Sequence, residues 1–142
     1  MVVEDDPSVA ENNITCLEEA GANVVYTDRV DSAISLIRTN TIDLILSDFH
    51  LPDGTAADLL AALNNLNVTI SVVLLSAEGK KANLQIEGDS LVQEVLTKPV
   101  SSSDLQNHIS AILAKKKKMR EKTPGVISFE ERQRILNDIT GE

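Results

Sequence analysis

Charged and hydroxyl side chains follow the apolar runs of this sequence, at the points where β-strands should end. Glu4 and Asp5 follow the first run, Asp48 follows the third, Ser76 ends the fourth, and Lys98 follows the fifth. Carboxylate oxygens are the ligands that hard cations such as Mg²⁺ prefer in proteins. The acids therefore predict a metal site, with a hydroxyl and an ammonium group at the same edge of the fold.

We expect these side chains to converge, because a doubly wound sheet binds its ligand beyond the carboxyl ends of the parallel strands, where the strand order reverses. The order 2-1-3-4-5 places Asp5 beside Asp48, with Ser76 and Lys98 on the far side. Two unit charges at about 4 Å repel by roughly 4 kcal/mol at an effective dielectric of about 20, so an empty acid cluster would be unstable. Mg²⁺, or Mn²⁺ in its place, relieves the repulsion, and the sequence offers no Cys or His pair for zinc.

Five short apolar runs alternate with helix-like segments, which is typical of an α/β fold with a parallel sheet. The expected strands are residues 2–3, 23–26, 42–47, 70–75 and 92–96, and the expected helices cover 7–20, the region around 33–37, 57–63 and a last segment from Ser103 or Asp104. Residues 78–90 are polar and predict a weak or mobile helix. Helices on both faces would cover an aliphatic core, because aromatic residues make up 2% of the chain.

The length of 142 residues suits one domain with a tail. We expect the domain over residues 1–118, and a linker or the start of an output or oligomerisation segment over 119–142. In this tail a break at 123–125 precedes a capped, amphipathic helical pattern with apolar residues at Phe129, Ile135, Leu136 and Ile139. A short helix of this kind must pack on something, so we expect the tail to dock on the domain or, with the last helix, to form a homodimer with a second copy of the chain. The alternative is a disordered remnant.

The net charge of −9 argues against direct binding of nucleic acid by this segment, since a duplex repels an acidic surface. No apolar run approaches the roughly 20 residues that span a bilayer. Lone Cys16 cannot form an internal disulfide, and Met1 leads directly into a strand-like run instead of a secretory leader. The chain is therefore predicted to be soluble and cytoplasmic.

Each polar residue also has a purely structural explanation. Asp6 precedes Pro7 and is placed to cap the first helix, Ser76 could cap a turn, and Lys98 could be an ordinary surface lysine. Taken singly, these explanations are as good as the functional ones. The joint position of the groups at the ends of consecutive strands favours one shared site.

Several segments resemble the motifs of a known family, the receiver domains of two-component response regulators, over residues 1–118. Residues 2–7 resemble its acidic strand end, 46–54 its phosphoacceptor loop, 74–77 its hydroxyl signature and 96–99 its lysine motif. The resemblance implies a flavodoxin-like receiver fold and a phosphoprotein of a phosphorelay. Such a domain is a signalling switch and not an enzyme, since it catalyses only its own phosphotransfer and dephosphorylation.

The resemblance also implies a role for each residue of the site. Asp48 would accept a phosphoryl group from a sensor histidine kinase or a phosphotransfer protein. Asp5, Asp48 and the backbone carbonyl of His50 would bind Mg²⁺ directly, and Glu4 would bind it through a water. Ser76 and Lys98 would hold the phosphoryl oxygens, the Lys98–Pro99 peptide would be cis, and the side chains of His50 and Glu78 would tune the lifetime of the phosphorylated state.

Two features depart from the family pattern. Val95 stands where the family commonly has an aromatic switch residue, and the segment between the fourth and fifth strands is short and polar. These features leave open a receiver-like adaptor that binds partners without a phosphorylation cycle. A haloacid-dehalogenase-like phosphatase is disfavoured because His50 stands where it needs a second aspartate, and a flavodoxin-like cofactor binder because the loop after the first strand is acidic.

Overall fold

The computed structural model describes residues 1–78 and 89–122, with residues 117–122 described by their helical backbone alone. Its strands are β1 (Val2–Val3), β2 (Tyr26–Thr27), β3 (Leu44–Asp48), β4 (His50–Leu51), β5 (Gly54–Thr55), β6 (Ser71–Ser76) and β7 (Val92–Thr97). Its helices are α1 (Pro7–Glu19), α2 (Val30–Thr39), α3 (Ala56–Asn65) and α4 (Ser102–Lys122). Strands and helices alternate along the chain, as the apolar runs predict.

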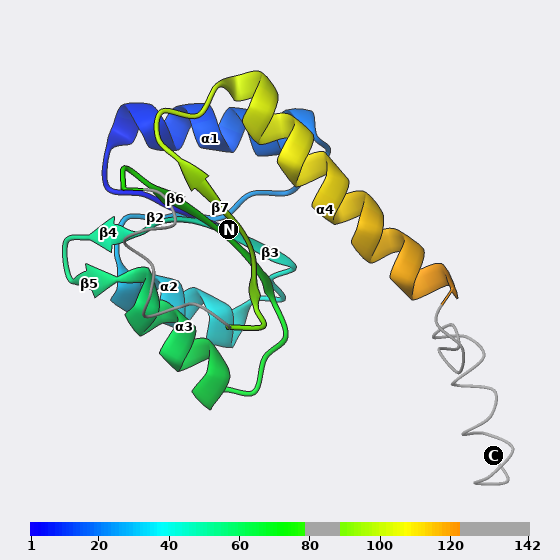
Figure 1. Ribbon diagram of the computed structural model, residues 1–142. Helices are drawn as coiled ribbons and strands as arrows, with labels where there is room; N and C mark the ends of the chain where they lie inside the picture. The colour runs from blue at the N-terminus through cyan, green and yellow to red at the C-terminus, as the bar shows by residue number, and fades with distance from the viewer. Residues whose placement is uncertain (79–88, 123–142) are drawn as a thin grey trace, which may run out of the picture. The chain divides into compact units, whose positions relative to one another are not determined.

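The described strands form a five-stranded parallel sheet of order β2-β1-β3-β6-β7 and a separate antiparallel hairpin of β4 and β5 (Figure 1). With the hairpin left out, this is the order 2-1-3-4-5, so the predicted doubly wound, flavodoxin-like sheet is confirmed. Helix α1 and residues 102–109 of α4 lie on one face of the sheet, and α2 and α3 lie on the other (Figure 1).

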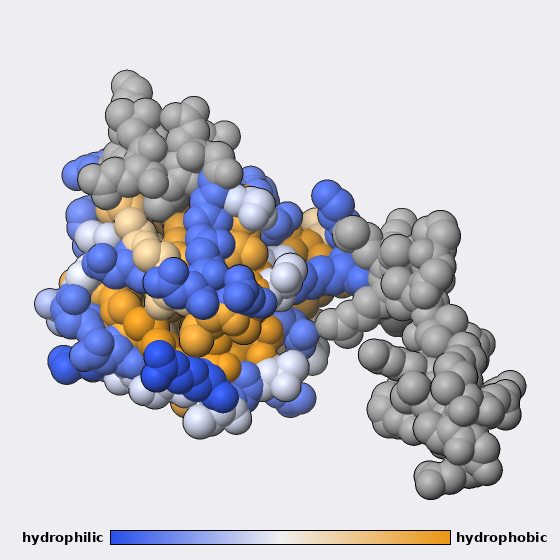
Figure 2. Space-filling view, turned by 90° about the horizontal axis from the view of Figure 1, so that it is seen from below, coloured by the Kyte–Doolittle hydropathy of each residue, from blue (hydrophilic) through white to orange (hydrophobic). Residues whose placement is uncertain are grey.

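The core is aliphatic and centres on β3 and β6. Every residue of β6 is buried, and so are the first four residues of β3, because these central strands are covered on both faces. Helix α3 adds Leu59, Leu60 and Leu63, which are all at most 2% exposed. Figure 2 views the side of α2 and α3, where apolar areas remain visible between hydrophilic ones.

Start and stop signals explain the bounds of α1. Asp6 is its N-cap and accepts hydrogen bonds from the backbone N–H groups of Ser8 and Val9, at 2.9 and 3.3 Å. Pro7 occupies the first turn, and Gly21 follows the helix with a φ of 91°, a conformation that favours glycine. The capping explanation for Asp6 is therefore confirmed.

Three local details differ from the prediction. β2 comprises only Tyr26–Thr27, because it pairs with the equally short β1. The backbone N–H of Asp104 donates to Ser101 Oγ at 3.1 Å, so Ser101 caps α4, and the choice of Ser103 or Asp104 was wrong because both already lie inside the first turn. The β4–β5 hairpin was not among the expected strands.

Parts of the predicted organisation lie outside the described residues. These are most of the predicted weak helix, at 79–88, and the tail from 123 onward. The chain divides into two units, Met1–Ile109 and Ser110–Glu142, and the site described below belongs to the first. Within the described part of the chain, no helix is both long and apolar enough to cross a membrane.

Candidate phosphoacceptor site

The carboxyl ends of β1, β3, β6 and β7 meet at one edge of the sheet. β1 pairs with β3 so that Val3 lies opposite Ser47, which brings Glu4 and Asp5 next to Asp48. β3 pairs with β6 so that Asp48 lies opposite Leu75, and β6 pairs with β7 so that Ser76 lies opposite Thr97. The sheet register therefore gathers side chains that are far apart in the sequence.

Three carboxylates form the centre of this edge. Oxygen atoms of Glu4, Asp5 and Asp48 all lie within 4.8 Å of one another. Glu4 is 1% exposed, and its Oε1 accepts a hydrogen bond from the backbone N–H of Asp6 at 3.2 Å. Its Oε2 is buried and has no hydrogen-bond partner among the described residues.

The environment of Glu4 disfavours its charge. Burial raises the pKa of the Glu4 carboxyl, the negative charge of Asp48 raises it further, and the positive charge of Lys98 acts in the opposite direction. Oε2 of Glu4 accepts no hydrogen bond among the described residues, and it shares the single ammonium group of Lys98, at 3.7 Å, with a cluster of three carboxylates. The residues present therefore fit a hard divalent cation with oxygen ligands, such as Mg²⁺.

Among the described residues, Lys98 brings its ammonium group to this cluster. Its Nζ lies 3.0 Å from Oδ1 of Asp48 and 3.7 Å from Oε2 of Glu4. Its backbone N–H donates to the carbonyl of Ser76 at 2.9 Å, which joins the ends of β6 and β7. The Lys98–Pro99 peptide is cis.

The other residues singled out in the sequence surround this centre. Ser76 is 1% exposed, and its Oγ accepts a hydrogen bond from the backbone N–H of Glu78 at 3.3 Å. The side chain of Glu78 is exposed. His50, two residues after Asp48, is also exposed, and its ring meets the ring of Phe49 edge-on at a centroid distance of 5.0 Å.

Residues 1–110 match the family model described as the response regulator receiver domain. The chain belongs to this family. Among relatives, the phosphate regulon transcriptional regulatory protein PhoB of Escherichia coli (strain K12) is 30% identical over 115 residues, covering 80% of this chain and 50% of that protein. The probable transcriptional regulatory protein TcrX of Mycobacterium tuberculosis is 32% identical over 117 residues, covering 80% of this chain and 48% of that protein. The receiver thus spans about half the length of these relatives.

Solved structures agree with this assignment. The receiver domain of the Francisella response regulator 1452 has a TM-score of 0.72 at 29% identity and covers 81% of this chain and 95% of that one. The signal receiver domain of a putative Luxo repressor protein from Vibrio parahaemolyticus has a TM-score of 0.73 at 25% identity and covers 87% and 95%. The fold of the receiver is therefore that of its family.

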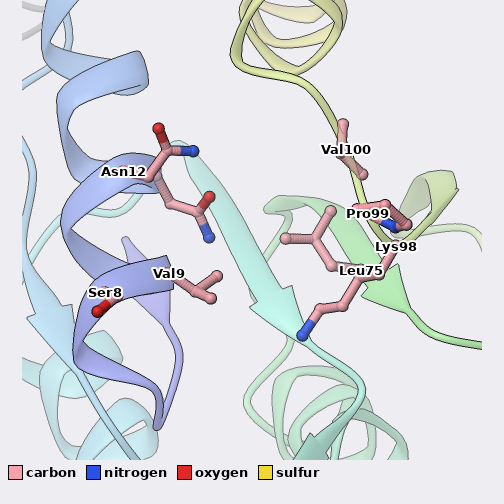
Figure 3. A pocket seen from close by; sticks show the side chains of 8 residues that line it. Ser8, Val9, Asn12, Leu75, Lys98, Pro99 and Val100 are labelled. Atoms are coloured by element: carbon pink, nitrogen blue, oxygen red, sulfur yellow. The ribbon is translucent and has the colours of Figure 1, made fainter.

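A groove opens beside Lys98 on the α1 side of the receiver. Its volume is about 450 Å³, and it is lined by Ser8, Val9, Asn12, Asn13, Leu75, Lys98, Pro99 and Val100. Figure 3 shows Ser8, Val9 and Asn12 of α1 across from Leu75 and the segment 98–100. The groove combines apolar walls with polar groups next to the lysine of the site.

Sequence reasoning missed two side chains that support this edge. The hydroxyl of Tyr26 donates to the carbonyl of Glu4 at 2.8 Å and so holds the acidic loop from β2. Oδ1 of Asp53 accepts from the backbone N–H of Val30 at 2.8 Å, and Oδ2 accepts from that of Asp31 at 3.0 Å. The Pro-Asp-Gly turn marks Asp53 as a loop residue, but no local signal points to a partner on α2.

Proposed function

We propose that this receiver accepts a phosphoryl group on Asp48 and that the phosphorylated form controls an output domain or a partner. The observation that carries the proposal is the position of Asp48, which lies within 4.8 Å of two further acids and 3.0 Å from the ammonium of Lys98. A carboxylate in this setting can act as a nucleophile, and the ammonium group beside it can neutralise the negative charge of an incoming phosphoryl group.

The donor would be a phosphohistidine of a sensor kinase or of a phosphotransfer protein. A carboxylate oxygen of Asp48 forms a bond to phosphorus while the bond from phosphorus to the imidazole nitrogen breaks, and the imidazole leaves with the electron pair and takes up a proton. The transferring group carries its negative charge on its equatorial oxygens, so catalysis consists mainly of positioning and charge neutralisation. Lys98 supplies one positive charge, and the hydroxyl of Ser76 is the hydrogen-bond donor on the adjoining strand end.

Asp5, Asp48 and the backbone carbonyl of His50 would hold Mg²⁺, and Glu4 would contact it through a water. When bound, the ion would add its positive charge to that of Lys98 and so help to neutralise the transferring phosphoryl group. The buried Oε2 of Glu4, which accepts no hydrogen bond among the described residues, and the raised pKa of this carboxyl support the assignment. Burial is the larger cause of the raised pKa and the neighbouring charge of Asp48 the second, and a cation would offset both. Tyr26 holds the backbone at Glu4 and thereby orients the acidic loop.

The groove next to Lys98 suits the approach of a donor protein. Val9, Leu75, Pro99 and Val100 offer apolar contact, and Asn12 and Asn13 offer amide groups. A partner side chain that packs here would place its phosphohistidine at the edge where Asp48 lies. This supports a protein donor, although small phosphoryl donors need only the site itself.

Formation of phosphoaspartate would give Ser76 and Lys98 a new set of oxygens to contact. The loops after β3 and β6 would then shift together, because Ser76 at the end of β6 would contact the phosphoryl group on Asp48 at the end of β3. Val95 is a partly buried member of the core, so the state of this receiver is read out without an aromatic ring at that position.

Incubation with acetyl phosphate and Mg²⁺, followed by intact-protein mass spectrometry, tests the proposal. The parent should gain the mass of one phosphate, and Asp48→Asn should gain none, because an amide cannot form the acyl phosphate. Glu18→Ala, at the far end of α1, is the control and should behave as the parent. A parent that takes up no phosphate would favour the adaptor without a phosphorylation cycle, and an undiminished gain in Asp48→Asn would place the acceptor elsewhere.

A further inference from the structure

Asp53 connects the loop after β3 to a helix that begins 23 residues earlier in the chain. Its two carboxylate oxygens accept one hydrogen bond each, from the N–H of Val30 at 2.8 Å and from the N–H of Asp31 at 3.0 Å. Both donors belong to the first turn of α2. One carboxylate thus binds two of the N–H groups that a helix leaves unpaired at its start.

The N-terminus of helix α2 has no side-chain cap from its own N-cap residue. Its N-cap position is Arg29, whose side chain makes no capping hydrogen bond. A carboxylate at a helix N-terminus satisfies free N–H groups and interacts favourably with the helix dipole. Asp53 therefore caps the N-terminus of α2 from a distant loop, whereas Asp6 caps α1 from the position directly before that helix.

The turn that carries Asp53 belongs to the β4–β5 hairpin, in which His50 pairs with Thr55 and Leu51 pairs with Gly54. The hairpin is fixed at its base, because the N–H of Ala56 donates to the carbonyl of Phe49 at 2.8 Å and the N–H of Thr55 donates to Asp58 at 2.9 Å. The tip of the hairpin is held by the hydrogen bonds of Asp53 to α2. The backbone of His50 lies between the fixed base and this fixed tip.

Space around the turn is also restricted. Gly54 has a φ of 157°, and a Cβ there would lie 2.5 Å from a carboxylate oxygen of Asp58 and 3.6 Å from Cγ2 of Val30. The turn therefore packs closely between α3 and α2. Loss of the Asp53 hydrogen bonds would free the tip on the α2 side while the base stays in place.

We propose that Asp53 is a positioning residue: by binding the first turn of α2 it fixes the β4–β5 hairpin and, through it, the backbone carbonyl of His50 at the metal position. This rests on the proposed function, in which that carbonyl is a ligand. Partners of metal ligands typically contribute about tenfold or more to metal affinity or activity. Asp53 acts on the site through the backbone and does not touch the reacting atoms.

The test compares Asp53→Ala, Asp53→Asn and the parent by calorimetric titration with Mg²⁺ and by the rate of phosphorylation from acetyl phosphate. We expect Asp53→Ala to weaken Mg²⁺ binding and to slow phosphorylation by about tenfold. Asp53→Asn should recover part of both, because its amide oxygen still accepts one of the two N–H groups. Faster hydrogen exchange at the amides of Val30 and Asp31 should accompany the loss in Asp53→Ala.

Two controls separate positioning from charge and from stability. Asp31→Asn removes an equal charge from the same helical turn and keeps the Asp53 hydrogen bonds, so it should leave Mg²⁺ affinity within about twofold of the parent. Ile37→Val removes a buried methylene group from α2 and so lowers stability without touching the hairpin, and it should also leave the Mg²⁺ affinity within about twofold of the parent.

The outcomes distinguish this inference from the function on which it rests. If the parent takes up no phosphate, the proposed function fails, and the Mg²⁺ titration still decides the role of Asp53. If the parent is phosphorylated on Asp48 while Asp53→Ala matches it in Mg²⁺ affinity and rate, the positioning role is wrong and the function stands. If Asp53→Ala and Ile37→Val lose Mg²⁺ affinity and phosphorylation rate to the same extent, Asp53 only stabilises α2 as a cap and has no positioning role.

Discussion

The ammonium nitrogen of Lys98 lies 3.0 Å from Oδ1 of Asp48, closer than its 3.7 Å distance to Oε2 of Glu4. The lysine therefore compensates the proposed acceptor more strongly than the buried acid behind it. With 28% of its side chain exposed, Lys98 also remains open to an incoming oxygen. We therefore expect one side chain to stabilise the acid cluster before phosphorylation and to bind the phosphoryl group afterwards.

Replacement of this lysine should cost stability in a way that depends on Mg²⁺. Lys98→Met removes the positive charge from three clustered carboxylates, and we expect the free energy of unfolding to fall by about 1 to 3 kcal/mol without Mg²⁺. Because the ion would supply positive charge to the same acids, saturating Mg²⁺ should recover part of the loss. Urea unfolding of parent and variant, with and without Mg²⁺, measures this difference.

Lys115→Met is the matched control, because Lys115 is exposed on α4 and its loss should change stability by less than about 0.5 kcal/mol. Phosphorylation of Lys98→Met from acetyl phosphate should be strongly slowed. A stability loss that Mg²⁺ leaves untouched would show that the lysine and the ion do not share the acid cluster.

Asp5 should contribute strongly to the affinity for Mg²⁺. Removal of one of the clustered carboxylates takes away a large part of the attraction, so Asp5→Asn should weaken binding by about tenfold, which corresponds to about 1.4 kcal/mol. Calorimetric titration measures the affinity. Asp6→Asn is the control one residue away, since asparagine still caps α1 while an equal charge is lost, and it should bind Mg²⁺ within about twofold of the parent. Equal affinities for Asp5→Asn and the parent would mean that the pocket has been misread.

The lifetime of the phosphorylated form should depend on His50 and Glu78. Both side chains are exposed, and they lie two residues beyond Asp48 and Ser76. We expect these positions to flank the approach of a water to phosphoaspartate. After removal of the donor, His50→Ala or Glu78→Ala should change the dephosphorylation rate by about threefold or more, in either direction. Glu18→Ala, at the far end of α1, should leave the rate as it is. If both site variants dephosphorylate at the rate of the parent, neither His50 nor Glu78 tunes the lifetime of the phosphorylated form.

The sheet, and the edge at which the candidate site residues meet, could be predicted from the sequence because both follow from short-range pattern and topology. A continuous apolar run such as β6 predicts a strand that is covered on both faces, and parallel pairing then brings the carboxyl ends of the strands to one edge. The sequence alone therefore predicts that Glu4, Asp48 and Lys98 lie together. The capping role of Asp6 was equally local, since cap and helix are neighbours in the chain.

Other features depend on tertiary contacts that leave no local trace. The hydrogen bonds from Val30 to Asp53 and from Tyr26 to the carbonyl of Glu4 join residues 23 and 22 positions apart, and nothing in either segment names its partner. The contrast between buried Glu4 and exposed Asp5 also escapes sequence reasoning, because two adjacent acids at a strand end look alike until the loop is placed.

The hydrogen bonds of Asp53 also predict how its contribution to stability varies with pH. The N–H groups of Asp31 and Val30 lower the pKa of the Asp53 carboxyl below its ordinary value of 3.8. A carboxyl whose pKa is lower in the folded state stabilises the fold above its unfolded-state pKa, and this contribution is lost as the pH falls through the folded-state pKa. The parent should therefore unfold at a higher temperature than Asp53→Asn near neutral pH.

The gap between the two melting temperatures should shrink as the pH falls below 3.8, because protonated Asp53 then resembles asparagine as an acceptor. Thermal unfolding by circular dichroism at a series of pH values, in parent and variant together, measures the gap and cancels the acid sensitivity that both share. Asp31→Asn serves as the reference, since its side chain accepts neither hydrogen bond and its gap to the parent should be small at every pH. A gap for Asp53→Asn that stays constant from neutral pH into acid would show that the ionised carboxylate is not what holds the first turn of α2.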